Sequence, residues 1–146
     1  PFQVKSVHLR SWNILIFTKI LLLDPLSEIG ALTSLILLYL PSNALDGSIP
    51  SEIGAVTKLT LLDLFDNSFD GSLPSEIGAL AKLDYIDLHN NLIVGSIPSE
   101  ISALSTLTLL TLSSNSLTGS IPESLCQQGL SINITVDENV TCSCCD

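Results

Sequence analysis

The sequence predicts an α/β solenoid, in which stacked coils place a parallel sheet on the concave side and short helical or 3-10 turns on the convex side. Its first sign is a period of 24 residues, because proline recurs at Pro50, Pro74, Pro98 and Pro122. Asparagine and glycine keep the same interval, at Asn43, Asn67, Asn91 and Asn115 and at Gly47, Gly71, Gly95 and Gly119. A period of this length is typical of units that bury their apolar face only by stacking on one another.

Each unit begins with alternating apolar residues, which predict a short strand with one face directed inward. Leu62 and Leu64 illustrate this spacing, and the equivalent residues of the other units are also leucine or isoleucine. We expect strands of successive coils to pair in parallel. The recurring asparagines follow the strands, where an amide side chain can satisfy backbone donors and acceptors of neighbouring coils. We therefore predict a structural ladder formed by Asn43, Asn67, Asn91 and Asn115.

The second half of each unit predicts turns. The glycine suits a backbone position with unusual dihedral angles, and the proline ends the following extended segment because it lacks an N–H donor. Ser75 and Glu76 then favour the first turn of a short helix, with Ser75 as its N-cap. The same Ser-Glu pair recurs in the other units, and its stacked glutamates predict a solvated edge rather than a cation site.

Taken together, each unit has the form L-x-x-L-x-L-x-x-N-x-[LF]-x-G-x-[IL]-P, and stretches such as "GSIPSEIGALT" resemble the plant-specific leucine-rich repeat. The resemblance covers Ser27 to Pro122. Similar repeats occur in ectodomains of plant receptor-like kinases, polygalacturonase-inhibiting proteins and related secreted algal proteins. It implies a right-handed leucine-rich repeat superhelix with four 24-residue repeats at 27–122, between an N-terminal segment at 1–26 and a C-terminal cap at 123–146.

The two ends depart from the repeat in different ways. Continued backwards, the register places Ile14 and Ile16 at strand positions, but Lys19 stands where asparagine belongs. Residues 1–26 are therefore either a degenerate coil that covers the open end or sequence that does not belong to the native fold. The C-terminal segment holds every cysteine of the chain, at Cys126, Cys142, Cys144 and Cys145.

These cysteines predict a disulfide-bonded cap of a secreted protein. We expect Cys126 to pair with one of the last three, and the adjacent Cys144 and Cys145 are the least suited to bond to each other. Cys142 then pairs with Cys144 or Cys145, or the remaining thiols await a partner. Two sequons, at Asn133 and Asn139, support the secretory route and predict glycosylation. A zinc site is not supported, because no histidine lies near the cysteines.

Between the core leucines, alternate residues of each strand point to the concave side. Unlike the core positions, these residues vary from coil to coil, and they include both tyrosines of the chain. Because aromatic residues dominate binding hot spots, we predict a ligand-binding face formed by Tyr39, Asp63, Phe65, Asp66, Asp84, Tyr85, Asp87, His89 and Thr111.

Composition excludes several classes of function. The net charge is −10, with 15 acidic residues against five lysines and arginines, which argues against binding nucleic acid or an anionic membrane. No apolar stretch reaches the ~20 residues that span a bilayer; the nearest, Ile14–Leu23, is interrupted by Lys19 and resembles only part of a signal-peptide core. Asp87 and His89 could act as a carboxylate–imidazole pair, but the sequence shows no oxyanion hole or dry pocket, so we expect no enzyme and no cofactor.

The predicted function is an extracellular, non-enzymatic recognition module that binds a protein, peptide or glycan. One alternative, implied by the resemblance, is a secreted inhibitor of cell-wall-degrading hydrolases. A more remote alternative is ice binding, for which regular threonine or serine rows are the expected sign. Thr60, Thr108 and Thr111 form no uninterrupted row, because Asp84 and Asp87 intervene. The sequence leaves the ligand and the oligomeric state open.

Overall fold

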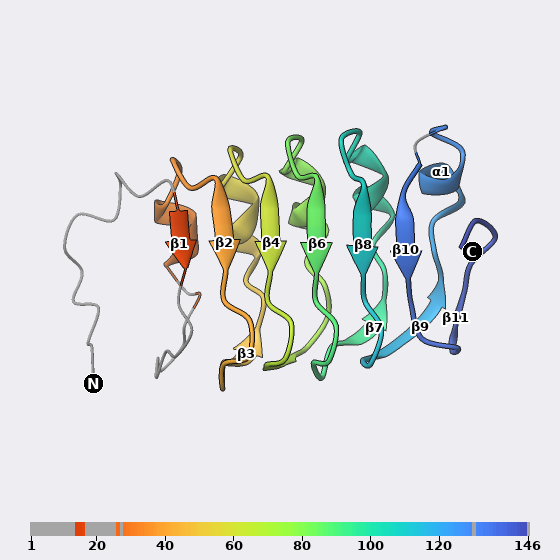
Figure 1. Ribbon diagram of the computed structural model, residues 1–146, viewed down its shortest axis with the longest axis horizontal. Coiled ribbons are helices and arrows are strands. Elements are labelled where there is room, and N and C mark those ends of the chain that lie inside the picture. Colours follow the sequence, from red (N-terminus) through yellow and green to blue (C-terminus); the bar gives the residue numbers. More distant parts are fainter. Residues whose placement is uncertain (1–13, 17–25, 27, 130, 146) are drawn as a thin grey trace.

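The computed structural model describes residues 14–16, 26, 28–129 and 131–145. Within them, a parallel sheet of six strands runs the length of the molecule in the order β1-β2-β4-β6-β8-β10 (Figure 1). Its strands are β1 (Ile14–Ile16), β2 (Leu37–Tyr39), β4 (Leu61–Asp63), β6 (Tyr85–Asp87), β8 (Leu109–Thr111) and β10 (Asn133–Thr135). The repeat therefore produces the predicted parallel sheet, with one strand from each coil.

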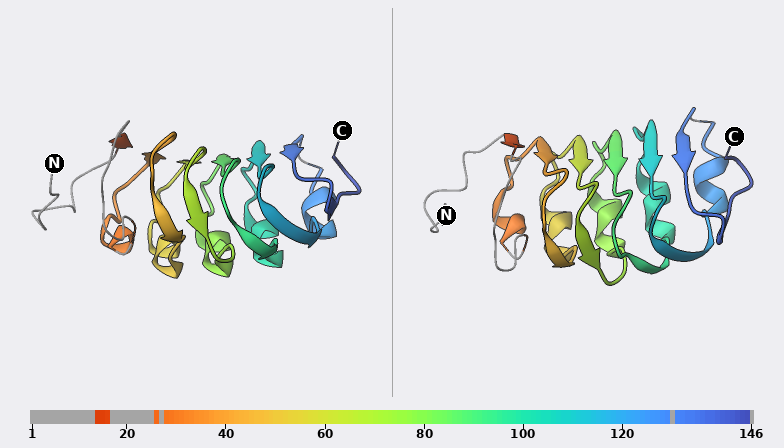
Figure 2. Two further views of the ribbon diagram at one scale, coloured as in Figure 1. Left: turned by 90° about the horizontal axis from the view of Figure 1, so that it is seen from below. Right: turned by 60° about the horizontal axis from the view of Figure 1, so that its bottom comes forward.

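Short helices line the side of the molecule opposite this sheet (Figure 2). They are the 3-10 helices η2 (Ile29–Ala31), η3 (Ser51–Ala55), η4 (Ser75–Ala79) and η5 (Ser99–Ala103), followed by the α-helix α1 (Glu123–Cys126). The predicted serine N-cap is wrong: Pro74 occupies the cap position of η4 and the helix has no side-chain cap. Ser75 begins the helix instead, and its Oγ donates to Glu76 at 3.3 Å. A 3-10 helix of five residues has few free amides, so the turn forms without the cap.

Close coil packing explains the glycine inside the helix η4. A Cβ at Gly78 would lie 2.4 Å from the backbone oxygen of Glu100 in the next coil. The equivalent position of η5 holds Ser102, whose Oγ meets Ser124 Oγ of the helix α1 at 2.7 Å. Glycine is thus required where one 3-10 helix stacks on another, and it is replaced where the neighbour is the cap.

A second set of short strands follows the concave sheet within each coil. They are β3 (Asp46–Ser48), β5 (Ser68–Asp70), β7 (Val94–Ser96), β9 (Ser116–Ser120) and β11 (Val140–Thr141). The strands β3 and β5 form one small sheet, and β7, β9 and β11 form another in the order β11-β9-β7. Gly47, Gly71, Gly95 and Gly119 all have positive φ, as predicted for the turn position. Leucines and isoleucines between the two sets of strands and the helical turns form one continuous core, with Phe69 as its largest fully buried side chain.

The asparagine ladder is confirmed, and Asn91 shows its geometry. Its Nδ2 donates to the carbonyls of Leu64, Leu88 and His89 at 3.0, 3.1 and 3.3 Å. Its Oδ1 accepts the backbone N–H of Phe69 at 3.0 Å. Asn67 and Asn115 make the equivalent bonds. Each of these three asparagines therefore joins its own coil to the preceding one and satisfies backbone groups there. Asn43 donates to the carbonyls of Leu40 and Pro41 in its own coil.

The N-terminal strand β1 lies in a different register from the one expected. Ile14 pairs with Leu37 and Ile16 pairs with Tyr39, so the core position Leu38 is matched by Leu15. The 24-residue spacing had aligned Ile14 with Leu38 instead. Ile14 is 53% exposed, as its alignment with a concave-face position requires. Residues 1–13 and 17–25, which make up most of the proposed N-terminal segment, lie outside the described residues.

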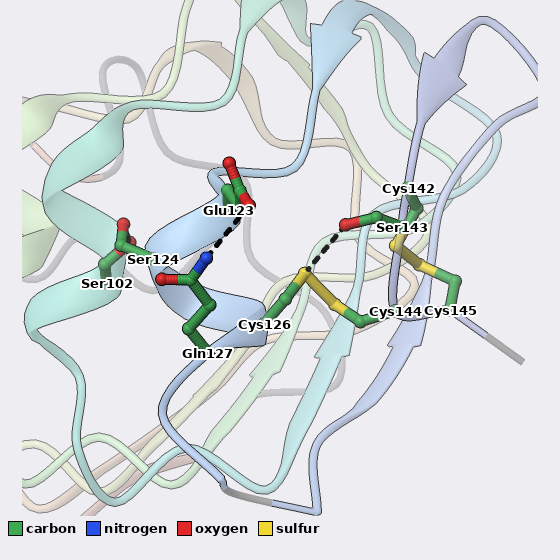
Figure 3. Close-up of a disulfide and its surroundings, with 9 residues drawn as sticks. All are labelled: Ser102, Glu123, Ser124, Cys126, Gln127, Cys142, Ser143, Cys144 and Cys145. Carbon is green, nitrogen blue, oxygen red and sulfur yellow. Dashed lines mark hydrogen bonds between the residues drawn. A yellow bond between two sulfur atoms is a disulfide. The ribbon is translucent and has the colours of Figure 1, made fainter.

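The C-terminal cap holds two disulfides, Cys126–Cys144 and Cys142–Cys145 (Figure 3). Cys126 thus pairs with one of the last three cysteines, as expected, and the adjacent cysteines do not bond to each other. The first disulfide connects the helix α1 to the segment that follows the strand β11. Because it closes a loop containing the strand β10, it fixes the final strand of the concave sheet against the last repeat.

Candidate functional site

The concave sheet aligns the predicted binding residues in rows that cross the strands. One row consists of Tyr39, Asp63, Asp87 and Thr111, which are register partners on β2, β4, β6 and β8. A second row places Tyr85 between Leu61 and Leu109. Parallel strands lie about 4.8 Å apart, so neighbouring side chains of a row are in contact range. Residues separated by 24 positions in the sequence therefore form one surface.

Asp63 and Asp87 point to the concave side but are buried, which corrects the expectation that they face solvent. Their exposed fractions are 4% and 8%. The rings of Tyr39, Phe65 and Tyr85 occupy flanking positions of the same face and are half-buried themselves. A short aspartate between longer aromatic side chains has little access to water. Alternation along a strand predicts the direction of a side chain, whereas its exposure depends on neighbours from other coils.

Phe65 and His89 form a stacked ring pair at the carboxyl end of the strands. Their ring centroids are 4.8 Å apart with an interplanar angle of 6°. His89 Nδ1 lies 2.7 Å from Oδ1 of Asp87, and the same oxygen accepts the backbone N–H of His89 at 3.1 Å. The pair that the sequence singled out, Asp87 with His89, is thus in direct contact. Asp87 orients the imidazole, and the imidazole supports the phenyl ring of Phe65.

Asp66 and Asp84 lie at opposite ends of the strands, so the structure does not bring them together. Asp66 follows the strand β4 in the left-handed conformation, with φ 57°, and accepts a hydrogen bond from Asn90 Nδ2. Asp84 immediately precedes the strand β6, where its carboxylate accepts a hydrogen bond from Thr108 Oγ1. Both side chains are exposed. They border the buried Asp63 and Asp87 on two sides and add negative charge to the rim.

Burial perturbs the ionisable groups at the centre of this face. It raises the pKa of Asp63 from an ordinary 3.8 to about 6, against the opposing effect of the Phe65 backbone N–H, and the nearby Asp87 carboxylate raises it further. Burial also raises the pKa of Tyr85, with the carboxylates of Asp87 and Asp63 as the next causes. The carboxylates and phenols therefore form one electrostatically coupled group, which we call the aspartate cluster: Asp63, Asp87, Tyr39, Tyr85 and His89.

Asp137 is a residue whose role the sequence analysis missed. Its Oδ1 accepts the backbone N–H of Ser114 at 2.6 Å, and its Oδ2 accepts that of Asn115 at 2.9 Å. In the preceding coil, the N–H groups of Asn90 and Asn91 bond instead to carbonyls of the next coil. Asp137 replaces those carbonyls where the repeats end. Its position 22 residues after the last ladder asparagine was the available signal.

The two predicted glycosylation sites lie in different places. Asn133 is exposed on the edge strand β10, where it pairs with Leu109 of the concave sheet. Asn139 is exposed in the turn that precedes the strand β11. Both side chains are accessible, so glycosylation stays a prediction at each. In the part of the chain that the structure describes, no group of three or more histidines, cysteines or carboxylates is arranged to hold a metal ion.

Comparison with known families identifies the repeats. A family model of the leucine-rich repeat matches residues 58–80, 82–104 and 106–128. These matches agree with the parallel sheet, the 3-10 turns and the asparagine ladder described above. The chain therefore contains leucine-rich repeats and has the fold of a leucine-rich repeat solenoid.

Solved structures of plant proteins share this fold. The chain is 36% identical to the ectodomain of the receptor kinase GASSHO1/SCHENGEN3 from Arabidopsis thaliana, in complex with CASPARIAN STRIP INTEGRITY FACTOR 2, with a TM-score of 0.72 over 79% of this chain. It is 38% identical to the plant peptide hormone receptor RGFR1 in complex with RGF2, with a TM-score of 0.72 over 79% of this chain. It is 34% identical to a plant ice-binding protein, with a TM-score of 0.71 over 79% of this chain.

The chain spans only part of each of these proteins: 14% and 18% of the two receptor chains and 37% of the ice-binding protein. No curated protein matches its sequence significantly. Across the described ranges, none of the helices has the length and apolar character needed to cross a bilayer.

Proposed function

We propose that the chain is an extracellular, non-enzymatic recognition module that binds a protein or peptide through its concave face. The observation that carries this proposal is that the residues which differ from coil to coil lie together on the concave face. The core and ladder positions repeat from coil to coil, but the concave rows bring Tyr39, Tyr85 and the Phe65–His89 stack around two aspartates. Half-buried aromatic side chains among polar groups are characteristic of binding hot spots.

The similar solved structures support a protein or peptide as the ligand. One similar structure is a receptor-kinase ectodomain in complex with an integrity factor, and another is a plant peptide hormone receptor in complex with RGF2. The two disulfides of the cap and the sequons fit an oxidising, secretory environment. A glycan ligand remains an alternative within the same proposal, since aromatic side chains also stack on sugar rings. Secreted inhibition of a cell-wall-degrading hydrolase is the functional alternative, tested by activity assays over a panel of such enzymes.

The proposal is tested by capturing partners from extracellular extract with the intact chain and then measuring affinity with variants. We expect the double substitution Tyr85→Ala with Phe65→Ala to weaken the complex at least about tenfold, because it removes both aromatic contacts. Leu92→Ala with Val94→Ala is the matched control, since these residues are exposed on the flank, at 58% and 44%, away from the concave sheet. Equal affinity of the concave-face variant and the wild type would move the site elsewhere.

Ice binding is a second candidate function because one similar structure is a plant ice-binding protein. The serines Ser48, Ser72, Ser96 and Ser120 are exposed and recur every 24 residues. They are not register partners, however, because Ser48 pairs with Asp70 and Ser96 pairs with Thr118. On the concave face, Asp87 pairs directly with Thr111 and so interrupts the threonine row, as the sequence indicated. Thermal hysteresis of the purified chain tests this candidate, and its absence at millimolar concentration would eliminate it.

A further inference from the structure

The two sequons of the chain lie at the same end of the solenoid, and each belongs to a strand that ends a sheet. The strand β10 is the last of the six-stranded concave sheet, and β11 is the last of the sheet β11-β9-β7 (Figure 1). Asn133 is the first residue of β10, and Asn139 immediately precedes β11. The sequons therefore mark the C-terminal edges of both sheets.

Burial along these two segments directs both asparagines outward. The middle residue of each sequon, Ile134 or Val140, belongs to the core and is only 7% or 5% exposed. The asparagine and the threonine on either side of it are exposed in both cases. Each sequon is thus anchored by its apolar residue and presents its asparagine at the surface. A bulky, hydrated glycan fits there without disturbing the core.

The ladder asparagines lie in the opposite environment. Asn91 is 6% exposed, and its Nδ2 donates to backbone carbonyls of two coils. The position two residues further on holds the core residue Ile93 instead of a serine or threonine, and the other ladder asparagines are likewise followed by leucine or phenylalanine. The repeats therefore exclude a glycan wherever coils stack, and the sequons occur only after the last repeat.

The end of the stack exposes strand edges. Within the described residues, β10 pairs with β8 alone and β11 pairs with β9 alone, whereas β2, β4, β6 and β8 have a neighbour on each side. An edge strand presents N–H and C=O groups to which a strand of another chain can add. The disulfide Cys126–Cys144 holds β10 in place, so this edge is an ordered template.

We propose that N-linked glycans at Asn133 and Asn139 shield the C-terminal edges of the two sheets and prevent a second copy of the chain from adding a strand there. The inference rests on the secretory placement in the proposed function and goes beyond recognition by the concave face. A glycan excludes another chain by its volume while water still solvates the edge backbone. Asn133 contributes more, because β10 has three residues in the larger sheet and β11 has two.

The test uses the intact chain secreted from a eukaryotic host under the host's signal peptide. Mass spectrometry of glycopeptides measures occupancy, and sedimentation velocity at about 0.15 M salt, where the net charge is screened, measures self-association. We expect both sites to be occupied and the protein to be monomeric. Asn133→Gln with Asn139→Gln should self-associate with a dissociation constant at least about tenfold below the limit set by the wild type. Asn133→Gln alone should have a larger effect than Asn139→Gln alone.

A glycan placed elsewhere separates shielding of the edges from a general gain in solubility. In the double variant, Ala55→Asn creates a sequon with Thr57 at the end of the convex helix η3, where both residues are exposed. We expect this chain to self-associate as strongly as the double variant. Wild-type protein treated with an endoglycosidase that leaves a single sugar on each asparagine provides a second measurement without any substitution, and it should associate more strongly than the untreated protein.

An unoccupied Asn133, a double variant as monomeric as the wild type, or suppression of self-association by the convex glycan would each overturn the inference. The proposed function is tested separately, because it depends on the affinity of a captured partner for Tyr85 and Phe65. A partner that requires these two residues would support concave-face recognition even if the double variant stays monomeric. Self-association of the double variant would support shielding even if no such partner is captured.

Discussion

Two rows of buried polar residues run across the coils, and they differ in how fully the fold satisfies them. In the ladder, Asn91 is 6% exposed, and its donors and acceptor are all bonded to backbone groups. On the concave face, Asp63 is 4% exposed, yet only one described donor reaches its carboxylate. Equal burial therefore has opposite consequences. The asparagine row stabilises the stack, whereas burial disfavours the ionised form of Asp63.

The largest expected effect comes from breaking the ladder. Asn91→Ala should destabilise the protein by about 3–5 kcal/mol, because it leaves several buried backbone groups without partners. Asn90→Gly is the adjacent control. Asn90 is exposed with φ 53°, which glycine adopts freely, so we expect a loss below about 1 kcal/mol. Urea unfolding at pH 7 measures both. Similar losses in the two variants would contradict the assigned role of the ladder.

The end of the ladder should show a smaller effect. Asp137→Ala removes the acceptors of the Ser114 and Asn115 amides and should destabilise the protein by about 1–3 kcal/mol. Glu138→Ala removes a neighbouring exposed carboxylate and should change stability little. Hydrogen exchange locates the effect, because the amides of Ser114 and Asn115 should exchange faster only in the Asp137 variant. Unchanged exchange at these amides would rule out Asp137 as the terminator of the ladder.

The smallest expected effect has the opposite sign. Asp63→Asn should stabilise the protein by about 1–2 kcal/mol at pH 7. The pKa of Asp63 is higher in the folded state than its ordinary 3.8, so the folded protein binds the proton more tightly. The cost of the charge therefore appears as the pH rises from about 4 and is complete above about 6. Below pH 4 the wild type and the variant should be equally stable. Asp66→Asn, at an exposed position, is the control, and unfolding curves from pH 3.5 to 7.5 provide the measurement.

Much of this organisation followed from periodicity. The parallel sheet, the asparagine ladder, the glycine turns and the pairing of Cys126 with a C-terminal cysteine were all predicted and are confirmed. Each depends on contacts between one coil and the next, and a repeating sequence presents those contacts in every unit. The register of β1 was wrong because residues before Leu26 no longer repeat. The serine cap was wrong because a short 3-10 turn does not require one.

The sequence by itself determined which residues occupy the core, the ladder and the concave face, because alternation within a strand fixes the direction of each side chain. Only the tertiary structure decided that Asp63 and Asp87 are buried, that Phe65 stacks on His89, and that Asp137 completes the last coil. These properties depend on side chains that come from different coils or from the cap. Exposure, ring contacts and pKa values are set by neighbours in space, and the stacking of the coils brings those neighbours together.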